Sequence, residues 1–284
     1  MVSKFPLTQL NNFDRLKTLT NPFFTMLFII LPIYNEEQCL QTLIQDIFNE
    51  FIDTEIRIIA INDGSTDKSL EILKSELRET DIICSHITNM NIGVVFSEGI
   101  REFLARSSRD DVLIIIESDE TSDIILIREL YKTIQEKKMD VVIASRYCSG
   151  GRYKSVPFFR LLLSYGANRF MKLIFPISNV SEYSLFCRAY SWDIMIQMRK
   201  QFGVHGIIQS RTFFSNAELL VKMSFLTDQI TEIPAVYDYG KKRGASKIRY
   251  LLTFLEYFTM IRMLRRIRKK VRHSQASDRT KAFQ

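Results

Sequence analysis

Leu-Ile-Ile-Ile-Glu-Ser-Asp-Glu-Thr-Ser-Asp, residues 113–123, decides the fold, because an apolar run passes directly into a cluster of acids. A run this apolar avoids water on both faces, so we expect a central strand at 112–116 in a sheet that is covered on both sides. Glu117 and Asp119 then follow at the carboxyl end of that strand. Open α/β sheets bind their ligands at this edge.

Glu117 and Asp119 are two residues apart, so near the end of a strand they can share one face. Two close carboxylates repel each other unless protons or a cation lie between them. Their hard oxygen atoms suit Mg²⁺ or Mn²⁺, ions that commonly bind a diphosphate as well. A solvated turn after a strand has the same composition. On this stretch alone, the metal site and the solvated turn are equally open.

Strand and helix patterns alternate through the first half of the chain with short connections. This alternation is typical of an α/β fold with a doubly wound, mostly parallel sheet flanked by helices. Pro32 should end the first strand, and Asn35 should cap the helix after it. We expect strands at 23–32, 55–61, 82–87, 112–116, 140–144, 182–188 and 229–237, and helices at about 37–51, 67–79, 94–106, 124–137, 156–175 and 217–224.

The composition fits one large domain or two small ones, with 284 residues of which 46% are hydrophobic. The four cysteines are scattered without a Cys-x-x-Cys pair, which argues against a zinc or disulfide framework and fits a reducing compartment. No signal peptide is apparent at 1–22, which we expect to form an N-terminal arm. No uncharged apolar stretch reaches the roughly 18–20 residues of a membrane span.

Positive charge is concentrated near the C-terminus. Residues 241–272 contain twelve Lys or Arg and one acid, Glu256, for a net charge of +11, so the rest of the chain carries −4 of the total +7. Apolar residues at helical spacing (Phe254, Phe258, Ile261, Leu264, Ile267 and Val271) predict a basic amphipathic helix at 248–272. Such a helix can lie in an anionic membrane interface. Packing against the core or in a dimer seam is the alternative, and residues 273–284 should be disordered.

Six short motifs occur in a characteristic order. They are Leu-Pro-Ile-Tyr-Asn-Glu-Glu (31–37), Ile-Asn-Asp-Gly-Ser-Thr-Asp (61–67), Asn-Ile-Gly (91–93), Glu-Ser-Asp (117–119), Ser-Arg-Tyr (145–147) and Gly-Ala-Ser-Lys (244–247). This order resembles the inverting family 2 glycosyltransferases with the GT-A fold. The resemblance is strongest to the polyprenol-phosphate sugar transferases of the dolichyl-phosphate mannosyltransferase type, and it covers about residues 24–250.

The resemblance implies a catalytic domain at 23–247 and a role for each matching position. Pro32, Tyr34, Glu36 and Asp63 would cradle the nucleoside of the donor, and Lys241 and Lys247 would meet its diphosphate. Glu117, Asp119 and Thr121 would hold Mg²⁺ or Mn²⁺. Arg146, Arg160 and Ser164 would face the acceptor phosphate, and with Asp119 they form the expected catalytic set.

Two departures from the family pattern affect the expected site. Glu117 replaces the usual Asp of the metal motif, which lengthens that ligand by one methylene. The family's Asp-x-Thr-Ser-Gly-Phe-Arg stretch occurs here at 182–188 as Glu-Tyr-Ser-Leu-Phe-Cys-Arg, with Phe186 in place of the glycine. The second change alters the expected shape of the acceptor pocket.

The resemblance predicts transfer of one sugar from a UDP- or GDP-sugar to an undecaprenyl- or dolichyl-type phosphate. The enzyme would be peripheral, at the cytoplasmic face of an anionic membrane, and a homo-oligomer is compatible with the sequence. One alternative is an enzyme of the same fold with a non-lipid glycan acceptor, which would need a general base for a neutral hydroxyl. Another is a non-catalytic protein that binds nucleotide sugars. Nucleic acid is not an expected partner, because the basic segment has no recognised binding motif.

Overall fold

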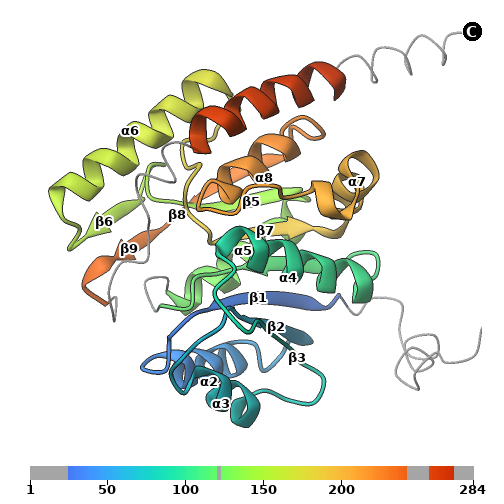
Figure 1. Cartoon of the computed structure of the whole chain (residues 1–284), viewed down its shortest axis with the longest axis vertical. Coiled ribbons are helices and arrows are strands. Elements are labelled where there is room, and N and C mark those ends of the chain that lie inside the picture. The colour runs from blue at the N-terminus through green and yellow to red at the C-terminus, as the bar shows by residue number, and fades with distance from the viewer. Residues whose placement is uncertain (1–24, 120–122, 242–255, 272–284) are drawn as a thin grey trace, which may run out of the picture.

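A seven-stranded sheet forms the centre of the molecule in the computed structural model, which describes residues 25–119, 123–241 and 256–271 (Figure 1). The strand order is β3-β2-β1-β4-β7-β5-β8. β4 lies between β1 and β7 and is buried along its whole length, which confirms the central strand predicted from the apolar run. The strands are β1 (Leu27–Ile33), β2 (Ile56–Asn62), β3 (Ile82–Ser85), β4 (Val112–Ile115), β5 (Val141–Ser145), β7 (Arg188–Ser191) and β8 (Ile230–Pro234).

Helices cover both faces of the sheet, as the alternating pattern predicts. One apolar core lies between the sheet and α2, α3 and α5. The other lies between the sheet and α4, α6, α7 and α8, together with residues 256–271. The helices are α2 (Leu40–Glu50), α3 (Ser69–Glu76), α4 (Ile92–Arg106), α5 (Ile124–Glu136), α6 (Phe158–Ile174), α7 (Trp192–Phe202) and α8 (Ser215–Met223), with short 3₁₀ helices η1 (Val204–Gly206) and η2 (Tyr239–Lys241).

β1 continues one residue past Pro32, so the prediction that this proline ends the strand is wrong. Pro32 lies opposite Ile61 of β2, whereas the pairing of β1 with β4 stops at Ile30. Every second residue of this part of the chain directs its backbone N–H and C=O groups toward β4, as the carbonyl groups of Met26 and Ile30 do, and Pro32 belongs to the same set. The missing N–H of Pro32 therefore faces a side where the neighbouring strand has already ended, and costs no ladder hydrogen bond.

β7 runs antiparallel to its two neighbours, β4 and β5, and begins later than predicted. The sequence pattern places a strand at 182–188, but the strand starts only at Arg188. The carboxylate of Glu182 accepts hydrogen bonds from the backbone N–H groups of Ser184 and Leu185, both at 3.0 Å. These local bonds fold the segment into a turn and remove its N–H groups from any sheet ladder.

Two further features, α7 and a small second sheet, differ from the sequence prediction. α7 begins directly after β7, where the side chain of Ser191 accepts a hydrogen bond from the N–H of Ile194 at 3.2 Å. A serine cap followed by Asp193 in the first turn is a helix start signal. The second element is a two-stranded parallel ribbon of β6 (Arg152–Lys154) and β9 (Val236–Asp238).

Residues 256–271 are helical, which agrees with the predicted C-terminal helix as far as the described residues reach. Its apolar stripe packs inward at Ile261, Leu264 and Val271, which are buried, whereas Phe258 of the same stripe is exposed. The core-packing alternative therefore holds at these three positions, and the expectation that they face a membrane is wrong. The arm at 1–22, the start of this helix and the tail at 273–284 lie outside the described residues. Within the described ranges, no helix has the length and apolar character needed to cross a membrane.

Gly93 of the Asn-Ile-Gly motif marks a close approach between α4 and the chain at 210–211. A Cβ at this position would lie 2.0 Å from the carbonyl oxygen of Ser210. We therefore expect Gly93→Ala to lower the free energy of unfolding by about 1–3 kcal/mol, because backbone must move to admit the methyl group. Urea unfolding measures this change.

Gly166→Ala is the matched control, because Gly166 lies within α6 with nothing inside 4 Å of its added Cβ. It should raise the free energy of unfolding by roughly 0.5–1 kcal/mol, the usual gain of alanine over glycine inside a helix. If both variants unfold at the same urea concentration, the close approach at Gly93 has no energetic consequence.

Candidate active site

The loops after β1 and β2 are joined by reciprocal hydrogen bonds at the carboxyl edge of the sheet. The N–H of Asn35 donates to Ser65 Oγ at 3.0 Å, and the N–H of Thr66 donates to Asn35 Oδ1 at 2.8 Å. The N–H of Glu36 donates to Ser69 Oγ at 2.9 Å. Asn35, with a positive φ of 54°, therefore joins two loops and is not the helix cap predicted for it. The bonds fix the backbone of the first two motifs as one rigid surface.

The three donor-site residues predicted in the first motif lie on this surface. Pro32 is near the end of β1, Tyr34 is half-buried in the loop, and the side chain of Glu36 lies 3.8 Å from the Sγ of Cys39. The same Sγ donates to the carbonyl oxygen of Ser118 at 3.2 Å. The first motif is thereby tied directly to the acidic turn after β4.

Asp63, the fourth predicted donor-site residue, is buried and already binds protein groups. Its Oδ1 accepts from the N–H of Met90 at 2.8 Å, and its Oδ2 accepts from the N–H of Asn91 at 3.1 Å. His86 Nδ1 lies 2.6 Å from Oδ1, and His86 Nε2 lies 2.5 Å from Glu98 Oε2. Asp63 therefore holds the loop after β3 in place at residues 90–91. His86, which lies between the carboxylates of Asp63 and Glu98, in turn holds Asp63.

Stability should depend on pH through His86. Burial pushes its pKa down, but the hydrogen bonds and charges of Asp63 and Glu98 outweigh burial, so the pKa is raised above the ordinary 6.5. The protonated ring therefore stabilises the fold fully below about pH 6.5, and this contribution is lost as pH rises through the raised pKa. Urea unfolding from pH 5.5 to 9 should show falling stability in the wild type and a flatter profile in His86→Gln.

His205→Gln is the control for this measurement, because His205 is exposed on η1, far along the chain from the loops. It should keep the wild-type profile. A profile for His86→Gln that follows the wild type would show that another group produces the pH dependence.

The acidic turn follows β4 where the sequence predicts it. Glu117 is half-buried and Asp119 is 8% exposed. Asp123 ends the turn by capping α5, since its side chain accepts from the N–H of Ile125 at 3.2 Å. The third expected metal ligand, Thr121, lies outside the described residues.

Glu117 and Asp119 fit a divalent cation as a partial ligand set. Their carboxylate oxygens are the ligands that Mg²⁺ and Mn²⁺ prefer. Across 25–119, 123–241 and 256–271, no group of three His, Cys, Asp or Glu side chains could hold a metal. A donor diphosphate and water commonly complete the ligand set of Mg²⁺ in proteins that bind phosphate substrates.

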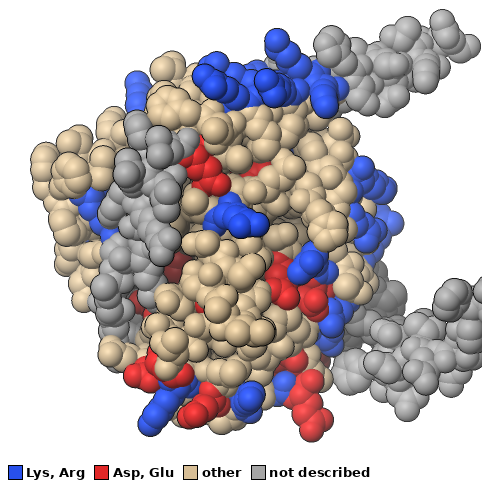
Figure 2. Space-filling view, viewed as in Figure 1, with Lys and Arg blue, Asp and Glu red and all other residues tan. Residues whose placement is uncertain are grey.

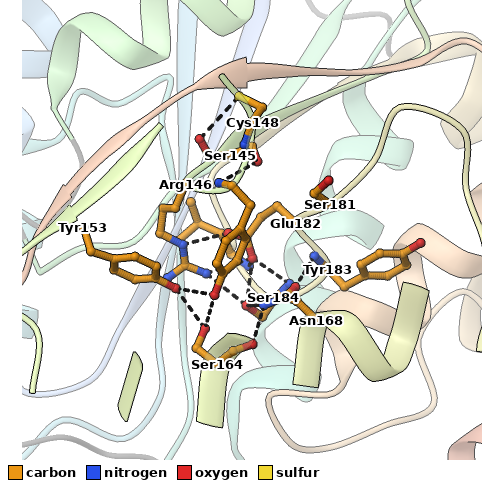
Figure 3. Close-up of polar contacts among 12 residues, drawn as sticks. Ser145, Arg146, Cys148, Tyr153, Ser164, Asn168, Ser181, Glu182, Tyr183 and Ser184 are labelled. Atoms are coloured by element: carbon orange, nitrogen blue, oxygen red, sulfur yellow. Dashed lines mark hydrogen bonds and ion pairs between the residues drawn. The ribbon is translucent and has the colours of Figure 1, made fainter. Parts of the chain in front are cut away.

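A second polar cluster lies beyond β5, around Arg146 (Figure 3). The guanidinium donates from Nε to Glu182 Oε2 at 2.7 Å and from Nη2 to Glu182 Oε1 at 2.8 Å. It also donates to Ser184 Oγ at 3.0 Å, and Asn168 of α6 donates to the same oxygen at 3.0 Å. The Arg146 side chain is 8% exposed and that of Glu182 is fully buried.

The pair is held in its charged state. Burial alone would raise the pKa of Glu182. The positive charge of Arg146 and the hydrogen bonds from Arg146 and Ser184 outweigh burial and hold this pKa below its ordinary value. Glu182 also accepts from Ser184 Oγ at 2.8 Å and from two backbone N–H groups. A carboxylate with this many donors is a poor proton acceptor.

Tyrosine rings enclose Arg146 on the side of the β6–β9 ribbon. The guanidinium carbon lies 4.7 Å from the centroid of Tyr153, 5.2 Å from that of Tyr237 and 5.7 Å from that of Tyr147. The hydroxyls of Tyr147 and Tyr153 are 2.7 Å apart, and each lies within 3.0 Å of Ser164 Oγ. Arg146 and Ser164, predicted from different segments, are thus brought together through two tyrosines.

Arg160 lies on α6 one turn before Ser164 and reaches η2. Its Nη1 donates to the hydroxyl of Tyr239 at 2.7 Å, and its guanidinium carbon lies 4.5 Å from the centre of that ring. This arrangement confirms that Arg160 and Ser164 share one helix. The side chain of Lys241, two residues after Tyr239, and all of Lys247 lie outside the part of the chain whose side chains are described.

Most residues of the cluster were not predicted as site residues: Tyr147, Tyr153, Asn168, Glu182, Ser184, Tyr237 and Tyr239. The sequence signal was the density of tyrosines at 147–165 and 237–239. No sequence pattern predicted the contacts of His86 with Asp63 and Glu98, because the loop after β3 and α4 bring these residues together only in the folded chain.

The family model for glycosyl transferase family 2 matches residues 28–195 of this chain. An uncharacterized protein of Methanocaldococcus jannaschii is 23% identical over 225 residues, covering 78% of this chain and 86% of that protein. A dolichol-phosphate mannosyltransferase of Pyrococcus furiosus is 26% identical over 235 residues, covering 82% of this chain and 62% of its own length. A polyprenol monophosphomannose synthase of Mycolicibacterium smegmatis is 24% identical over 171 residues, covering 59% of this chain and 62% of that protein.

Among solved structures, glucosyl-3-phosphoglycerate synthase of Mycobacterium tuberculosis has a similar fold. Its complex with Mn²⁺, uridine diphosphate and glucosyl-3-phosphoglycerate superposes with a TM-score of 0.58 at 14% sequence identity, covering 95% of this chain and 86% of that one. At this identity the likeness concerns the fold.

Proposed function

This chain belongs to glycosyl transferase family 2, and from that membership we propose that it transfers one sugar from a UDP- or GDP-sugar to a polyprenyl phosphate. An undecaprenyl- or dolichyl-type phosphate is the acceptor class. Two of its relatives are named as dolichol-phosphate and polyprenol-phosphate mannose enzymes, which supports this choice. The phosphate oxygen attacks C1 of the sugar as the bond from C1 to the diphosphate breaks, with inversion at C1.

The state of Glu182 is the observation that carries the choice of acceptor. A neutral hydroxyl acceptor needs a general base in the transition state. Glu182 lies in the Arg146 cluster, but it is fully buried and bound by Arg146, Ser184 and backbone N–H groups. A phosphate acceptor is already an anion near pH 7 and needs positioning rather than deprotonation.

On the donor side, the joined loops after β1 and β2 would support the nucleoside through Pro32, Tyr34 and Glu36. Asp63 would act mainly by holding the loop at 90–91. Glu117 and Asp119, with Thr121, would hold the divalent ion. Mg²⁺ or Mn²⁺ at that place would supply positive charge for the leaving diphosphate.

On the acceptor side, Arg160 and Ser164 would contact the lipid phosphate from α6. Their present partners, Tyr239 for Arg160 and two tyrosine hydroxyls for Ser164, would exchange for phosphate oxygens. Arg146 would act mainly as a positioning residue, because Glu182 takes up two of its N–H groups and the tyrosine rings surround it. Lys241 and Lys247 would approach the donor diphosphate.

A transfer assay tests the proposal. The full chain is incubated with Mg²⁺ or Mn²⁺, undecaprenyl or dolichyl phosphate, and a panel of UDP- and GDP-sugars, and we expect a polyprenyl-phosphate sugar product with at least one donor. Transfer only to a non-lipid glycan, or donor binding without turnover, would contradict the proposed acceptor.

Arg160→Gln should raise KM for the lipid phosphate about tenfold or more, because the variant loses a charged hydrogen-bond donor to the phosphate. Arg169→Gln, an exposed arginine on the same helix, should not.

A further inference from the structure

α6 exposes an unusual amount of apolar side chain on the face that points away from the core. Phe158 is 78% exposed, Phe159 70% and Leu173 80%. Leu162, Leu163, Tyr165 and Phe170 are also exposed. Together these seven residues form what we call the α6 apolar face. Contiguous exposed apolar surface of this kind marks a site of contact with a partner or a membrane.

The opposite side of α6 is engaged with the protein. Asn168 and Met171 are buried, and Ser164 binds the tyrosine hydroxyls. The helix is therefore firmly seated, and its apolar residues are exposed because they point away from the domain.

A row of positive charge follows the neighbouring helix. Residues 256–271 contain six Lys or Arg and one acid, Glu256. Ile261 and Leu264 enter the same core cluster as Met171 of α6, so the charged side of this helix faces out. Figures 1 and 2 show the result, with a largely uncharged surface over α6 and blue side chains along the helix at 256–271 on the same side of the molecule.

We propose that the α6 apolar face and the basic side of residues 256–271 form one docking surface for an anionic lipid bilayer. α6 would lie at the boundary between headgroups and acyl chains, and the Lys and Arg side chains would meet lipid phosphates. This assigns the apolar contact mainly to α6, because Ile261, Leu264 and Val271 of the basic helix pack against the domain. The inference deepens the proposed function and rests on it in naming a membrane lipid as the acceptor.

Charge favours a bilayer over a second copy of the chain. A two-fold contact through this surface would bring the same patch of both copies together. Two rows of six basic side chains would then lie close to each other and repel. An anionic bilayer attracts the same row while it covers the apolar face.

The docking surface also explains the position of Arg160 and Ser164. Both lie on α6 itself, on the side that faces the tyrosine cluster. A helix lying in the interface would hold these two side chains near the depth of lipid headgroups. A polyprenyl phosphate could then present its phosphate to them without leaving the membrane.

Vesicle cosedimentation of the full chain tests the docking surface. We expect the wild type to bind vesicles of phosphatidylcholine with 30% phosphatidylglycerol and to bind pure phosphatidylcholine weakly. The triple variant Phe158→Ser, Phe159→Ser, Leu173→Ser should bind the anionic vesicles about tenfold more weakly or worse, because it loses three large apolar groups. Arg265→Gln with Arg266→Gln should reduce the preference for the anionic lipid.

The matched control replaces three exposed isoleucines elsewhere, Ile52, Ile87 and Ile125, with Ser. It should bind as the wild type does. Equal binding by the α6 triple variant and the wild type would overturn the proposal, as would wild-type self-association that the triple variant abolishes without any vesicle binding.

A vesicle-free assay with a short, water-soluble polyprenyl phosphate separates this proposal from the proposed function. The α6 triple variant should keep wild-type transfer there, because its three positions touch neither donor nor acceptor groups. If neither protein transfers sugar but only the wild type binds vesicles, the docking surface stands and the proposed function fails.

Discussion

Replacing Asp119 with Asn is expected to lower kcat for sugar transfer by about 10²–10³-fold, the largest catalytic effect that we anticipate from a single substitution. The amide keeps the size of the side chain but removes the negative charge that attracts a divalent ion. Asp119 is almost buried at the end of the central strand, so water cannot easily replace the lost ligand. Transfer is measured at saturating donor over a range of Mn²⁺ concentrations.

Asp123→Asn is the control, four residues away in the same acidic turn. Asp123 caps α5 through the N–H of Ile125, and asparagine is also a good cap. This variant should keep nearly full transfer activity. Full activity in Asp119→Asn would remove Asp119 from the metal site.

Replacing Glu182 with Gln is expected to lower the free energy of unfolding by about 3–5 kcal/mol, the cost of leaving one member of a buried ion pair without its partner. Arg146 would keep its charge without the carboxylate, because a guanidinium stays protonated at any pH at which the protein is studied. The amide offers one acceptor oxygen where the carboxylate offered two. Urea unfolding at pH 7 measures the loss.

A double variant distinguishes a lost ion pair from general disruption. Arg146→Met with Glu182→Leu removes both charges, and should be more stable than Glu182→Gln alone, because no uncompensated charge remains in the interior. If the double variant loses as much stability as the single variants Arg146→Met and Glu182→Leu added together, the pair contributes no coupling energy.

The same pair predicts an acid limit of stability. The pKa of Glu182 is lowered in the folded chain, so its contribution is present above about pH 4.5, the ordinary value, and is lost as pH falls through the lowered pKa. The wild type should therefore lose stability in acid more steeply than the double variant.

The central sheet was predictable because its strands are apolar enough to exclude alternatives. The run at 112–116 and the strand at 140–144 are buried as expected, and the acids follow β4 as expected. Short motifs after strands also identified which loops meet, because parallel strands bring their carboxyl ends to one edge.

What the sequence pattern missed depends on hydrogen bonds between individual side chains and the backbone. The segment at 182–188 has the composition of a strand, yet Glu182 binds the N–H groups of Ser184 and Leu185 and delays the strand to Arg188. Asp63 was predicted to cradle the nucleoside, and the structure adds that its oxygens accept hydrogen bonds from the loop at 90–91. Periodicity alone gives no information about such hydrogen bonds between side chains and the backbone.

The helix at 256–271 shows a further limit. An apolar stripe with basic residues beside it is the pattern of a membrane-surface helix and also of a helix packed on a domain. Only the burial of Ile261 and Leu264 distinguishes the two. The sequence of the helix predicted at 156–175 likewise fits both an interfacial helix beside the site and an ordinary core helix, and the exposure of its apolar residues distinguishes the two.

The most direct measurement is anomalous diffraction from crystals of the full chain grown with Mn²⁺ and a nucleoside diphosphate. We expect one manganese peak at the end of β4, bound by carboxylate oxygens of Glu117 and Asp119 and by oxygens of the diphosphate. A nucleotide bound with no metal at these residues, or a manganese peak elsewhere in the molecule, would contradict the proposed site.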